Sequence, residues 1–380
     1  MSKANNNEQT THSPTAPKVA IVHDWLYGGG AEQVVLELHR MFPEAPIYTS
    51  FATDEWREKL NHKVVTGYLQ WWPFRHLRKF LPLLRQWWFS GLDLSSYDLV
   101  ISSSGNGEAK FVKTPPGTKH FCYCHTPTHF YWRHFDQYLK RPGVRPYWLV
   151  RLGLRLLVKP LRRRDYQAAQ RVDVFIANSS HIQSDIKRYY DRDSTVIHPP
   201  VDTTRFKTAP DTTVRNSFIT VGRQTPFKRT DIIVEACNKL AVNLVVVGSG
   251  PEHENLKQLA GPTVTFRGAL YGEELVQLVA SAKAFLFAAH EDFGIAPVEA
   301  LAAGTPVIAY HAGGALDYVV EGKTGMFFAE QTAESLAHVL RKFENTTWDH
   351  DDISRHAEQF STQAFHNSIK KLIIKHSDSY

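Results

Sequence analysis

The stretch from Ala284 to Ala309, AFLFAAHEDFGIAPVEALAAGTPVIA, decides the fold. It begins with six apolar residues, a run that favours a strand buried on both faces of a sheet. A polar turn follows at residues 290–292, and apolar residues then recur at helical spacing over residues 295–303. Another apolar run starts after the glycine that ends this helix. The stretch therefore predicts a βαβ unit, with Glu291 at the carboxyl end of its first strand and Glu299 inside its helix.

The two acids stand where parallel α/β sheets hold ligands. Such sheets bind ligands at the carboxyl ends of their strands, where helix N-termini favour phosphate groups. Glu291, Phe293-Gly294 and Glu299 resemble the E-x7-E motif of the family 4 retaining glycosyltransferases. The resemblance implies an α/β protein of the GT-B fold, in which two Rossmann-like domains face each other across a cleft. It also implies that a C-terminal helix, from about residue 352 to residue 375, crosses back to the first domain.

Length and composition fit that organisation. The chain of 380 residues allows roughly two domains of ~150–200 residues each. We expect a disordered tail at residues 1–17, an acceptor-side domain at 18–200 and a nucleotide-sugar-binding domain at 201–351, with residues 352–380 completing the first domain. The tail lacks the apolar core of a signal peptide, and no apolar run reaches the ~18 residues of a membrane span. The three cysteines have no metal or disulfide spacing, which indicates core thiols in a reducing compartment and a cytoplasmic protein.

A glycine-rich turn follows the first predicted strand, residues 18–25. Gly28-Gly29-Gly30 lead into a helix that begins near Ala31. Glycines at such a turn let backbone N–H groups approach an anion, although a tight turn without a ligand explains the pattern equally well. The family resemblance implies that Gly29 and Gly30 lie against the diphosphate of the donor. A later polar loop, residues 102–108, suits hydrogen bonding to a sugar or phosphate, or a plain surface turn.

The segment CYCHTPTHFYW, residues 122–132, places two histidines and several aromatic residues at the end of another predicted strand. His125 stands directly at the strand end, and the resemblance implies that it lies near the donor sugar. A structural role is the alternative for His125, and it is the favoured interpretation for His129. The phrase His-Thr-Pro-Thr, followed by Tyr-Trp, resembles the subgroup that handles mannosyl units in bacterial surface polysaccharide assembly.

Two stretches carry most of the basic excess of the chain, whose net charge is +6. Tyr68–Gly91 combines Trp and Phe with Arg and Lys, and Lys140–Arg164 is rich in Lys and Arg and has no acid. Within the second, Arg151, Arg155 and Lys159 recur every four residues, which predicts a helix with one cationic stripe and a broad apolar face. The extensive apolar surroundings favour an anionic membrane surface on the inner face of the cell membrane over nucleic acid. A core helix with a solvated edge is the alternative.

The second half adds two cations on one predicted loop. After a strand at residues 217–221, Arg223 and Lys228 stand five residues apart above the edge of the sheet. Two such cations suit a diphosphate clamp, because negative charge grows on the leaving group as the glycosidic bond breaks. The resemblance implies this role, and surface ion pairs are the alternative. A double glycine at residues 313–314 also resembles a turn of the family, but we assign no role to the following acid, Asp317.

The resemblance implies a retaining reaction without a metal ion or another cofactor, in which the nucleotide sugar is a co-substrate. Sugar hydroxyls would bind Glu291 and ribose hydroxyls Glu299, and a phosphate oxygen would take the proton of the attacking acceptor hydroxyl. The catalytic set would be His125, Glu291, Arg223 and Lys228. The donor-binding set would be Gly29, Gly30, Arg223, Lys228, Glu291, Asp292, Phe293, Gly294, Ile295 and Glu299.

We expect GDP-mannose as the donor, because of the resemblance to the mannosyl subgroup, and a saccharide or a polyprenyl-diphosphate-linked saccharide as the acceptor. The alternatives are a UDP-sugar-dependent glycosyltransferase of the same fold and a nucleotide-sugar epimerase, which would need neither the E-x7-E motif nor a membrane-facing helix. The short chain disfavours a GT-B phosphorylase. The complete diphosphate clamp together with His125 disfavours a sugar-nucleotide sensor without enzymatic activity.

Overall fold

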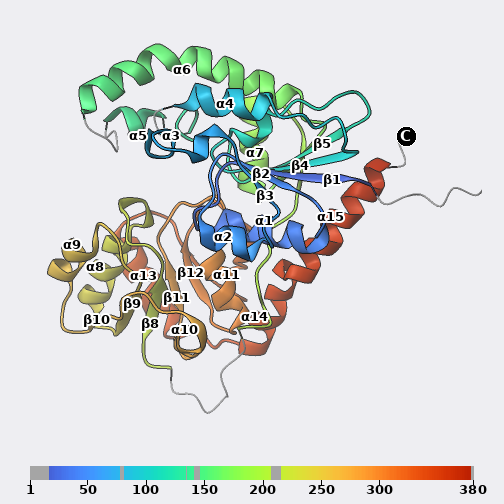
Figure 1. Cartoon of the computed structure of the whole chain (residues 1–380). Helices are drawn as coiled ribbons and strands as arrows, with labels where there is room; N and C mark the ends of the chain where they lie inside the picture. The colour runs from blue at the N-terminus through green and yellow to red at the C-terminus, as the bar shows by residue number, and fades with distance from the viewer. Residues whose placement is uncertain (1–16, 78–80, 134, 141–145, 207–214, 378–380) are drawn as a thin grey trace, which may run out of the picture.

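The computed structural model describes residues 17–77, 81–133, 135–140, 146–206 and 215–377. It contains two parallel sheets, one above the other in Figure 1. We call the part built on strands β1–β7 the first domain and the part built on β8–β13 the second domain. The prediction of an α/β protein with two Rossmann-like sheets is confirmed. The predicted disordered tail lies outside the described residues, except for Pro17.

The first sheet has seven parallel strands in the order β3-β2-β1-β4-β5-β6-β7. Its core strands are buried on both faces: in β1, Val19 and Ile21 face one apolar core while Ala20 and Val22 face another. Cys122 and Cys124 of β5 are both buried on the same face of the sheet, as predicted. The strands are β1 (Val19–His23), β2 (Ile47–Thr49), β3 (Val64–Val65), β4 (Leu99–Ser104), β5 (Lys119–Cys124), β6 (Val174–Ala177) and β7 (Ser194–Val196).

Helices cover both faces of this sheet. Strand β3 ends at Val65, because Gly67 brings the chain against the Trp88 indole and a 3-10 turn follows. A Cβ atom at Gly67 would lie 2.0 Å from the indole nitrogen. The helical elements are α1 (Gly30–Met41), α2 (Asp54–Lys59), η1 (Tyr68–Gln70), α3 (Phe74–Leu77), α4 (Pro82–Ser90), η3 (Ala109–Phe111), α5 (Phe135–Lys140), α6 (Tyr147–Gln170) and α7 (Ser180–Tyr190).

The second sheet has six parallel strands in the order β10-β9-β8-β11-β12-β13, with one apolar core on each face. The predicted βαβ unit is present as β11, α11 and β12. The strands are β8 (Phe218–Val221), β9 (Leu244–Val247), β10 (Val264–Phe266), β11 (Phe285–Phe287), β12 (Val307–Tyr310) and β13 (Gly325–Phe328). The helical elements are η4 (Pro226–Lys228), α8 (Thr230–Leu240), α9 (His253–Leu259), α10 (Gly272–Ala280), α11 (Ile295–Ala302), α12 (Ala315–Tyr318) and α13 (Ala333–Phe343).

The chain passes between the domains twice, and the two crossing segments pair with each other. The N–H of Val201 donates to the carbonyl of Phe360 at 3.0 Å, and the N–H of Thr362 donates to the carbonyl of Val201 at 3.1 Å. The prediction of one continuous C-terminal helix is therefore wrong, because these backbone groups bond to Val201 at the point where the helix would have continued. Three elements replace it: α14 (His350–Ala357), η5 (Glu358–Phe360) and α15 (Thr362–Ser377).

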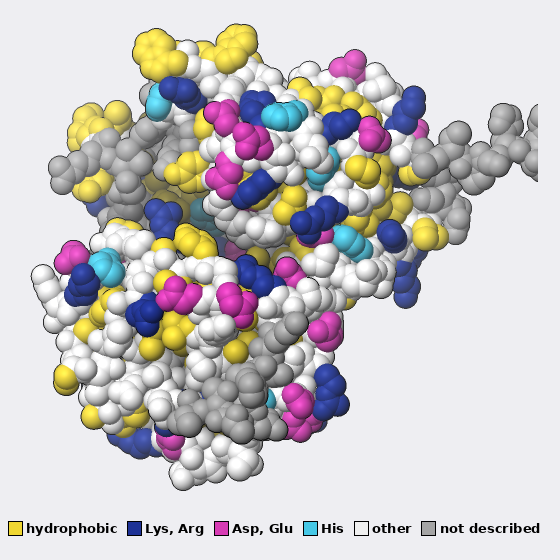
Figure 2. Space-filling model, turned by 60° about the horizontal axis from the view of Figure 1, so that its bottom comes forward, with side chains coloured by type: hydrophobic (Ala, Val, Ile, Leu, Met, Phe, Trp, Pro, Cys, Tyr) yellow, Lys and Arg dark blue, Asp and Glu magenta, His cyan; other side chains and the backbone are white. Residues whose placement is uncertain are grey.

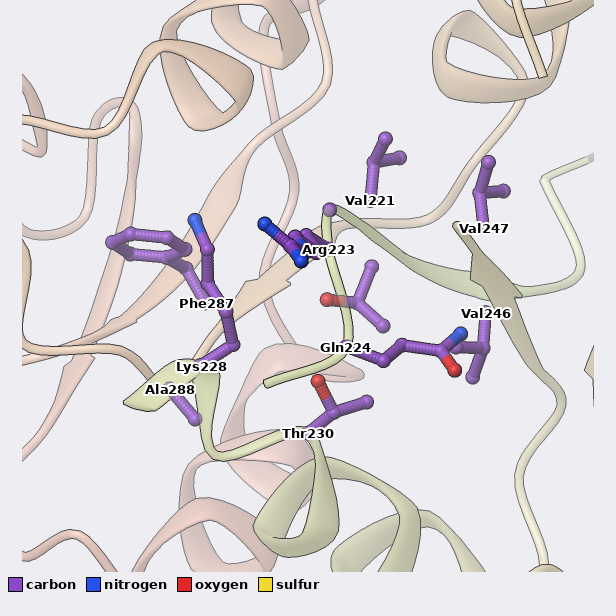
Figure 3. Close-up of a pocket in the computed structure, with 11 residues that line it drawn as sticks. Val221, Arg223, Gln224, Lys228, Thr230, Val246, Val247, Phe287 and Ala288 are labelled. Carbon is purple, nitrogen blue, oxygen red and sulfur yellow. The ribbon is translucent and has the colours of Figure 1, made fainter. Parts of the chain in front are cut away.

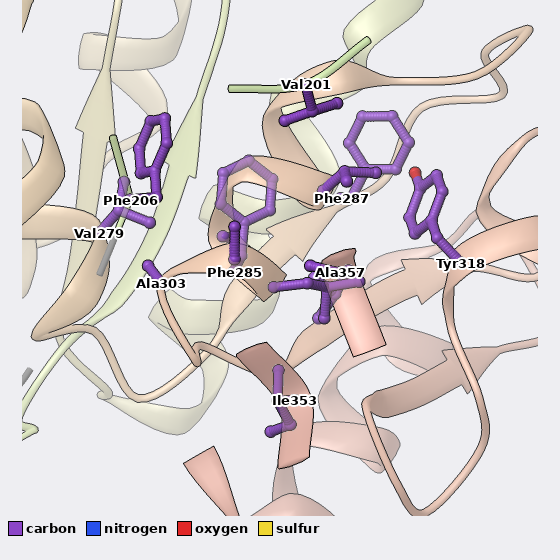
Figure 4. Packing of buried hydrophobic residues seen from close by; sticks show 14 of the residues in the cluster. Val201, Phe206, Val279, Phe285, Phe287, Ala303, Tyr318, Ile353 and Ala357 are labelled. Carbon is purple, nitrogen blue, oxygen red and sulfur yellow. The ribbon is translucent and has the colours of Figure 1, made fainter. Parts of the chain in front are cut away.

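The two halves of this C-terminal segment belong to different domains. Ile353 and Ala357 of α14 lie in the core of the second domain, near Phe285 (Figure 4). Helix α15 packs along α1, with Phe365 and Ile369 in the core of the first domain (Figure 1). The return of the chain to the first domain, which the family resemblance implied, is thus carried by α15.

Two buried ion pairs hold the helices of the first domain against its sheet. Lys110 Nζ lies 2.6 Å from Asp165 Oδ1, and both side chains are almost completely buried. Asp165 also accepts hydrogen bonds from Thr128, Trp132 and Tyr190 at 2.8–2.9 Å. A buried charge needs such full pairing, because the loss of hydration is otherwise uncompensated. Helix α6 thereby fixes the segment that follows β5.

The second buried pair joins α4 to the loop after β4. Glu108 accepts hydrogen bonds from the Arg85 guanidinium at 2.7 and 3.1 Å, and both side chains are buried. Burial raises the pKa of the Glu108 carboxyl to about 7, although the neighbouring Arg85 opposes this shift. Four charged side chains of this domain are thus part of its interior.

The outer side of the first domain, where α4 and α6 lie in Figure 1, in contrast exposes large apolar side chains on these helices and at residues 71–72. The core-helix alternative is wrong for the first half of α6, and only from Val158 onward do its side chains enter the core. Residues 78–80 and 141–145 of the two predicted basic stretches lie outside the described residues. The exposed apolar side chains are Trp71, Trp72, Trp87, Tyr147, Trp148, Leu149, Leu152, Leu156 and Leu157.

The cations on α6 do not all have the same role. Arg151 donates to the carbonyls of Leu139 and Lys140, at 2.8 and 2.7 Å, and so caps the end of α5. Arg155 and Lys159 are exposed, next to the apolar side chains of the same helix. Within the described ranges, no helix is both long enough and apolar enough to cross a membrane.

Asp165→Ala should lower the free energy of unfolding by about 3–5 kcal/mol, because it leaves Lys110 charged and unpaired in the core. Chemical denaturation followed by circular dichroism measures the change. Glu334→Ala is the matched control, since it removes an exposed carboxylate that pairs with Lys239 and should leave the free energy of unfolding nearly unchanged. Equal losses in the two variants would contradict the importance of the buried pair.

Candidate active site

The loop between β11 and α11 lies at the carboxyl end of a central strand of the second sheet. Ligands bind at this edge in open parallel sheets. Glu291 of the loop forms an ion pair with Lys228, which stands at the end of η4 after the neighbouring strand β8. Two predicted donor-binding residues from distant parts of the sequence are thus in direct contact. Figure 2 shows the surface hollowed where the two domains meet.

Arg223 and Lys228 extend from the same loop, and Figure 3 shows their charged ends on the same side of it. Together with Phe287 and Ala288 they line a narrow cavity of about 10 Å³. Glu291 compensates the charge of Lys228, whereas the exposed Arg223 forms no ion pair with any described carboxylate. One cation of the predicted clamp is therefore neutralised by the protein, and the other is available to an anion.

The double glycine at residues 313–314 supports the Glu291 loop from behind. The N–H of Gly314 donates to the carbonyl of Glu291 at 2.9 Å. Gly313 has a φ of +68°, and a Cβ atom there would lie 2.3 Å from the same carbonyl oxygen. Only glycine fits this contact, because both the left-handed backbone and the close approach exclude a side chain.

The predicted residues that follow Glu291 form the turn into α11. Asp292 pairs with Arg133 of the first domain, and the ring of Phe293 is buried in the core. Gly294 precedes the helix with a φ of +93°, and Ile295 begins it. Of these side chains only Asp292 is polar, so the other three can meet a ligand through backbone groups or apolar contact.

Glu299 lies on α11 and is half-buried. Burial raises the pKa of its carboxyl, and the nearby Arg205 opposes that shift. No described side chain or backbone N–H donates a hydrogen bond to this carboxylate. Its acceptor oxygens are therefore available to hydroxyl groups of a ligand.

His125 stands at the end of β5 in the first domain, as predicted. Its Nε2 lies 2.8 Å from the Ser103 hydroxyl, and Nδ1 of His23 lies 2.9 Å from the Ser103 carbonyl. Because His23 Nδ1 must donate to that carbonyl, the Ser103 hydroxyl can donate to His125 and leave its Nδ1 as the remaining N–H. Burial and the nearby His23 lower the pKa of His125 to about 3, so this ring is neutral at neutral pH.

The glycine-rich turn of the first domain reaches the start of α11. A Cβ atom at Gly30 would lie 2.9 Å from Cδ1 of Ile295. The carboxylate of Glu32 accepts the N–H of Gly28 at 2.8 Å, so one donor of the turn is already used within the protein. Gly29 and Gly30 lie beyond that bond, beside the second domain.

The polar loop at residues 102–108 has a structural role that the sequence did not predict. The carboxylate of Asp24 accepts hydrogen bonds from the N–H groups of Gly105, Asn106 and Ala109, at 2.5–2.7 Å. These three donors are therefore unavailable to a sugar or phosphate. A buried aspartate that follows the first strand, 81 residues before Gly105, gives no local signal of this contact.

Arg133 ties the two domains together beside Glu291, and sequence reasoning missed it. Its guanidinium forms ion pairs with Asp185 of α7 and with Asp292 of the second domain, the latter at 2.5 Å. The hydroxyl of Ser179 donates to the Asp292 carbonyl, also at 2.5 Å. Arg133 and Asp292 are 159 residues apart, and no spacing rule connects them.

Asp317 also has a contact that the sequence left unassigned. Its carboxylate accepts the N–H of Ser180 at 2.7 Å, and Ser180 is the first residue of α7. A carboxylate at a helix N-terminus accepts hydrogen bonds from backbone N–H groups that have no partner within the helix. Its negative charge is also stabilised by the positive end of the helix dipole. The second domain thereby caps a helix of the first.

The described residues contain no group of three or more His, Cys, Asp or Glu side chains that could hold a metal ion. Independence of metal ions stays a prediction. Each predicted site residue is described, and the contacts join Lys228 to Glu291, Gly30 to Ile295 and Asp292 to Arg133.

Gly313→Ala should displace the Glu291 carbonyl and destabilise the protein by about 1–3 kcal/mol beyond the backbone cost, because the new methyl group overlaps the loop. Gly322→Ala is the matched control: its φ of +73° is similar, but a Cβ atom there meets nothing within 4 Å. The control should cost about 1–2 kcal/mol, the usual penalty for a left-handed residue. Denaturation midpoints compare the two, and equal values would contradict the proposed support of the loop.

Two family models match the chain, and together they span residues 28–364. The model for Glycosyltransferase Family 4 matches residues 28–205, which include the first sheet from β2 onward. The model for Glycosyl transferases group 1 matches residues 200–364, which include the whole second sheet. The two matches meet at the crossing segment that contains Val201.

Curated relatives match parts of the chain. A GDP-mannose-dependent alpha-mannosyltransferase of Mycobacterium tuberculosis is 38% identical over 128 residues, which are 32% of this chain and 34% of that protein. A D-inositol 3-phosphate glycosyltransferase of Streptomyces avermitilis is 29% identical over 212 residues, 47% of this chain and 46% of that protein. The matched part thus spans about a third to a half of the length of these relatives.

Solved structures share the architecture over nearly the whole chain. HepE of Anabaena, solved in complex with UDP, superposes with a TM-score of 0.72 at 18% identity, covering 94% of this chain and 100% of that one. Sucrose-phosphate synthase from Thermosynechococcus elongatus gives 0.69 at 18% identity, covering 96% and 100%. At such identities the likeness establishes the fold alone. With both family models matched and two separate parallel sheets present, the chain belongs to the family 4 glycosyltransferases and has the GT-B fold.

Proposed function

We propose that the chain is a retaining, metal-independent glycosyltransferase that moves a hexosyl unit from a nucleotide sugar to a saccharide or lipid-linked saccharide. The observation that carries the proposal is the contact of Lys228 with Glu291 at the edge of the second sheet, beside the unpaired Arg223. Two cations suit a diphosphate, and an adjacent carboxylate suits the hydroxyl groups of the attached sugar.

Donor binding would rearrange this ion pair. A diphosphate carries more charge than one carboxylate, so it would draw Lys228 and Arg223 together on its oxygens. Glu291 would then be free to accept hydrogen bonds from the sugar. Glu299 would accept them from the ribose, because its half-buried carboxylate has no described donor. The Gly29-Gly30 turn would close over the diphosphate from the first domain.

In the proposed reaction, the bond between the anomeric carbon and the diphosphate oxygen breaks while the acceptor hydroxyl attacks from the same face. The proton of that hydroxyl passes to an oxygen of the departing diphosphate. Arg223 and Lys228 stabilise the leaving charge. His125, whose pKa is about 3, is neutral at neutral pH and would donate a hydrogen bond from Nδ1 to the sugar without acting as a cationic acid.

GDP-mannose is our preferred donor. The mannosyltransferase of M. tuberculosis is named as GDP-mannose-dependent, and the His-Thr-Pro-Thr segment at residues 125–128 resembles the mannosyl subgroup. A UDP sugar is the second candidate, because HepE was solved with UDP. A nucleotide-sugar epimerase would convert the donor in the absence of an acceptor, so incubation of donor alone separates that class from a transferase.

We further propose that the outer face of α4 and α6 rests on the anionic inner surface of the cell membrane. Trp87, Trp148 and Leu156 are exposed there, and Arg155 and Lys159 lie beside them. Aromatic residues and cations around an apolar patch are the side chains that an anionic bilayer interface binds. This location would bring the cleft near a polyprenyl-diphosphate-linked acceptor.

Titration calorimetry without metal tests the donor site. We expect GDP to bind more tightly than UDP or ADP, and GDP-mannose to bind more tightly than GDP. Lys228→Ala should weaken GDP binding roughly 10–100-fold, since a hydrogen bond to a charged group contributes about 1.5–3 kcal/mol. Lys239→Ala removes an equal charge from an exposed pair and should leave binding unchanged. Preference for UDP would overturn the donor, and unchanged binding in Lys228→Ala would overturn the site.

Sedimentation with phosphatidylglycerol-containing vesicles tests the docking face. Reversal of Arg155 and Lys159 to Glu should weaken vesicle binding at least tenfold, because each cation near an anionic surface contributes about 1 kcal/mol. We choose these two residues because Arg151 also caps α5. Reversal of Lys370 and Lys371, which are exposed on α15, is the matched control. Equal vesicle binding by both variants would refute docking through α6.

A further inference from the structure

A second cavity lies on the outer side of the first domain, where the C-terminal ends of α4 and α6 meet the segment after η3. Its volume is about 480 Å³, far larger than the narrow space between Arg223 and Lys228. Three of its lining residues are cations, Lys113, Arg164 and Arg171, and none is an acid. Trp87 and Phe111 provide its apolar wall.

Neutral groups hold the two arginines of this pocket in place. Arg164 Nε donates to the side-chain oxygen of Gln86 at 2.9 Å, and Arg171 donates to the carbonyls of Gln167 and Phe111 at 3.3 and 3.4 Å. Among the residues that the structure describes, no carboxylate forms an ion pair with Lys113, Arg164 or Arg171. The two arginines are therefore oriented, and the positive charge of all three residues is not compensated by a described carboxylate.

The two arginines also repel each other. They lie seven residues apart, Arg164 on α6 and Arg171 directly after its last residue, which is about two helical turns and places both on one side of the helix. Burial and the charge of Arg164 lower the pKa of the Arg171 guanidinium from its ordinary value. A bound anion would relieve this repulsion, and the planar guanidinium groups suit the paired oxygens of a phosphate.

The pocket is continuous with the exposed apolar surface. Trp87 belongs to both, being 56% exposed and part of the pocket wall. On α6, Gln167 of the pocket follows Leu149 by eighteen residues and Leu156 by eleven, so at about 3.6 residues per turn all three face the same way. A surface that seats Leu149 and Leu156 among lipid chains would therefore place the pocket at the level of the headgroups.

We infer that the pocket of Lys113, Arg164 and Arg171 binds the phosphate of an anionic lipid headgroup while α4 and α6 rest on the bilayer. The inference rests on the docking face proposed above. It adds a specific binding site for one headgroup to the general electrostatic attraction between that face and an anionic membrane. The pocket lies at the end of α6 that leads into β6, whereas His125 stands at the opposite, carboxyl edge of the sheet. Headgroup binding would thus orient the enzyme without entering its cleft.

The test compares three double variants by sedimentation with mixed vesicles of phosphatidylcholine and phosphatidylglycerol. Arg164→Gln with Arg171→Gln should weaken binding roughly 30-fold, from about 1 kcal/mol per cation. Arg164→Lys with Arg171→Lys keeps the charge but loses the planar donors, and should still weaken binding several-fold. Lys370→Gln with Lys371→Gln on α15 is the charge-matched control and should bind like the unaltered protein.

Three results would overturn the inference. The first is the absence of a difference in vesicle binding, either between the glutamine pair and the control pair, or, for the unaltered protein, between vesicles with and without phosphatidylglycerol. The second is full binding by the lysine pair, which would reduce the pocket to diffuse attraction. The third is calorimetric binding of inorganic phosphate that the glutamine pair abolishes while vesicle binding stays unchanged, which would assign the pocket to a soluble anion.

Calorimetry with GDP keeps this test separate from the proposed transferase. GDP should bind all three double variants as it binds the unaltered protein, because none of the changed side chains contacts the donor site. Failure of GDP to bind any of the proteins would count against the transferase proposal and leave the vesicle comparison intact. Vesicle binding that fails while GDP binds normally would count against the pocket and the docking face, and leave the transferase proposal intact.

Discussion

The backbone pairing of Val201 with Phe360 and Thr362 is the constraint on which the arrangement of the two domains depends. Both connections between the domains run through this point, so the two covalent links between the sheets lie next to each other. Other links beside the cleft include two polar ones, the ion pair of Arg133 with Asp292 and the cap that Asp317 provides for α7. Partly exposed polar contacts contribute only about 1 kcal/mol each, so domains joined in this way are expected to move relative to one another. Such motion about the crossing would admit a nucleotide sugar between the sheets.

The charged side chains in the cleft are paired in a way that the binding of an anionic ligand would change. Lys228 and Glu291 neutralise each other, His125 is held neutral by burial, and Arg223 is left without a carboxylate among the described residues. The protein thereby avoids the cost of an isolated buried charge while it retains groups that an incoming diphosphate can recruit. The backbone donors of the loop after β4 are used differently, since Asp24 binds them and makes that loop part of the scaffold.

The first domain combines a buried ion pair in its otherwise apolar interior with large apolar side chains on its surface. Lys110 and Asp165 are buried and fully bonded, whereas Trp148 and Leu156 are exposed on the same helix, α6, that carries Asp165. A buried ion pair is seldom more stabilising than an apolar core, so its use here serves to fix α6 in one position. A large exposed apolar surface has no stabilising role in the isolated chain and marks a site of interaction. The buried ion pair and the exposed apolar surface are related, because a helix that exposes one side to a partner must be fixed to its own domain through the other side.

The sequence by itself determined the two parallel sheets and the places of the candidate site residues at the ends of their strands. Buried strands and amphipathic helices produce periodic patterns, so a local reading was sufficient for the βαβ unit around Glu291, and the resemblance to the family 4 enzymes implied the arrangement in two domains. It could not show that the C-terminal segment breaks at Ser361, because the bonds that end the helix come from Val201. Nor could it assign Arg133, Asp317 or Asp24, whose partners lie far away in the chain. Only the tertiary structure decided which face of α6 is exposed and which cations remain unpaired, because burial and ion pairing depend on what packs against a residue and not on its neighbours in sequence.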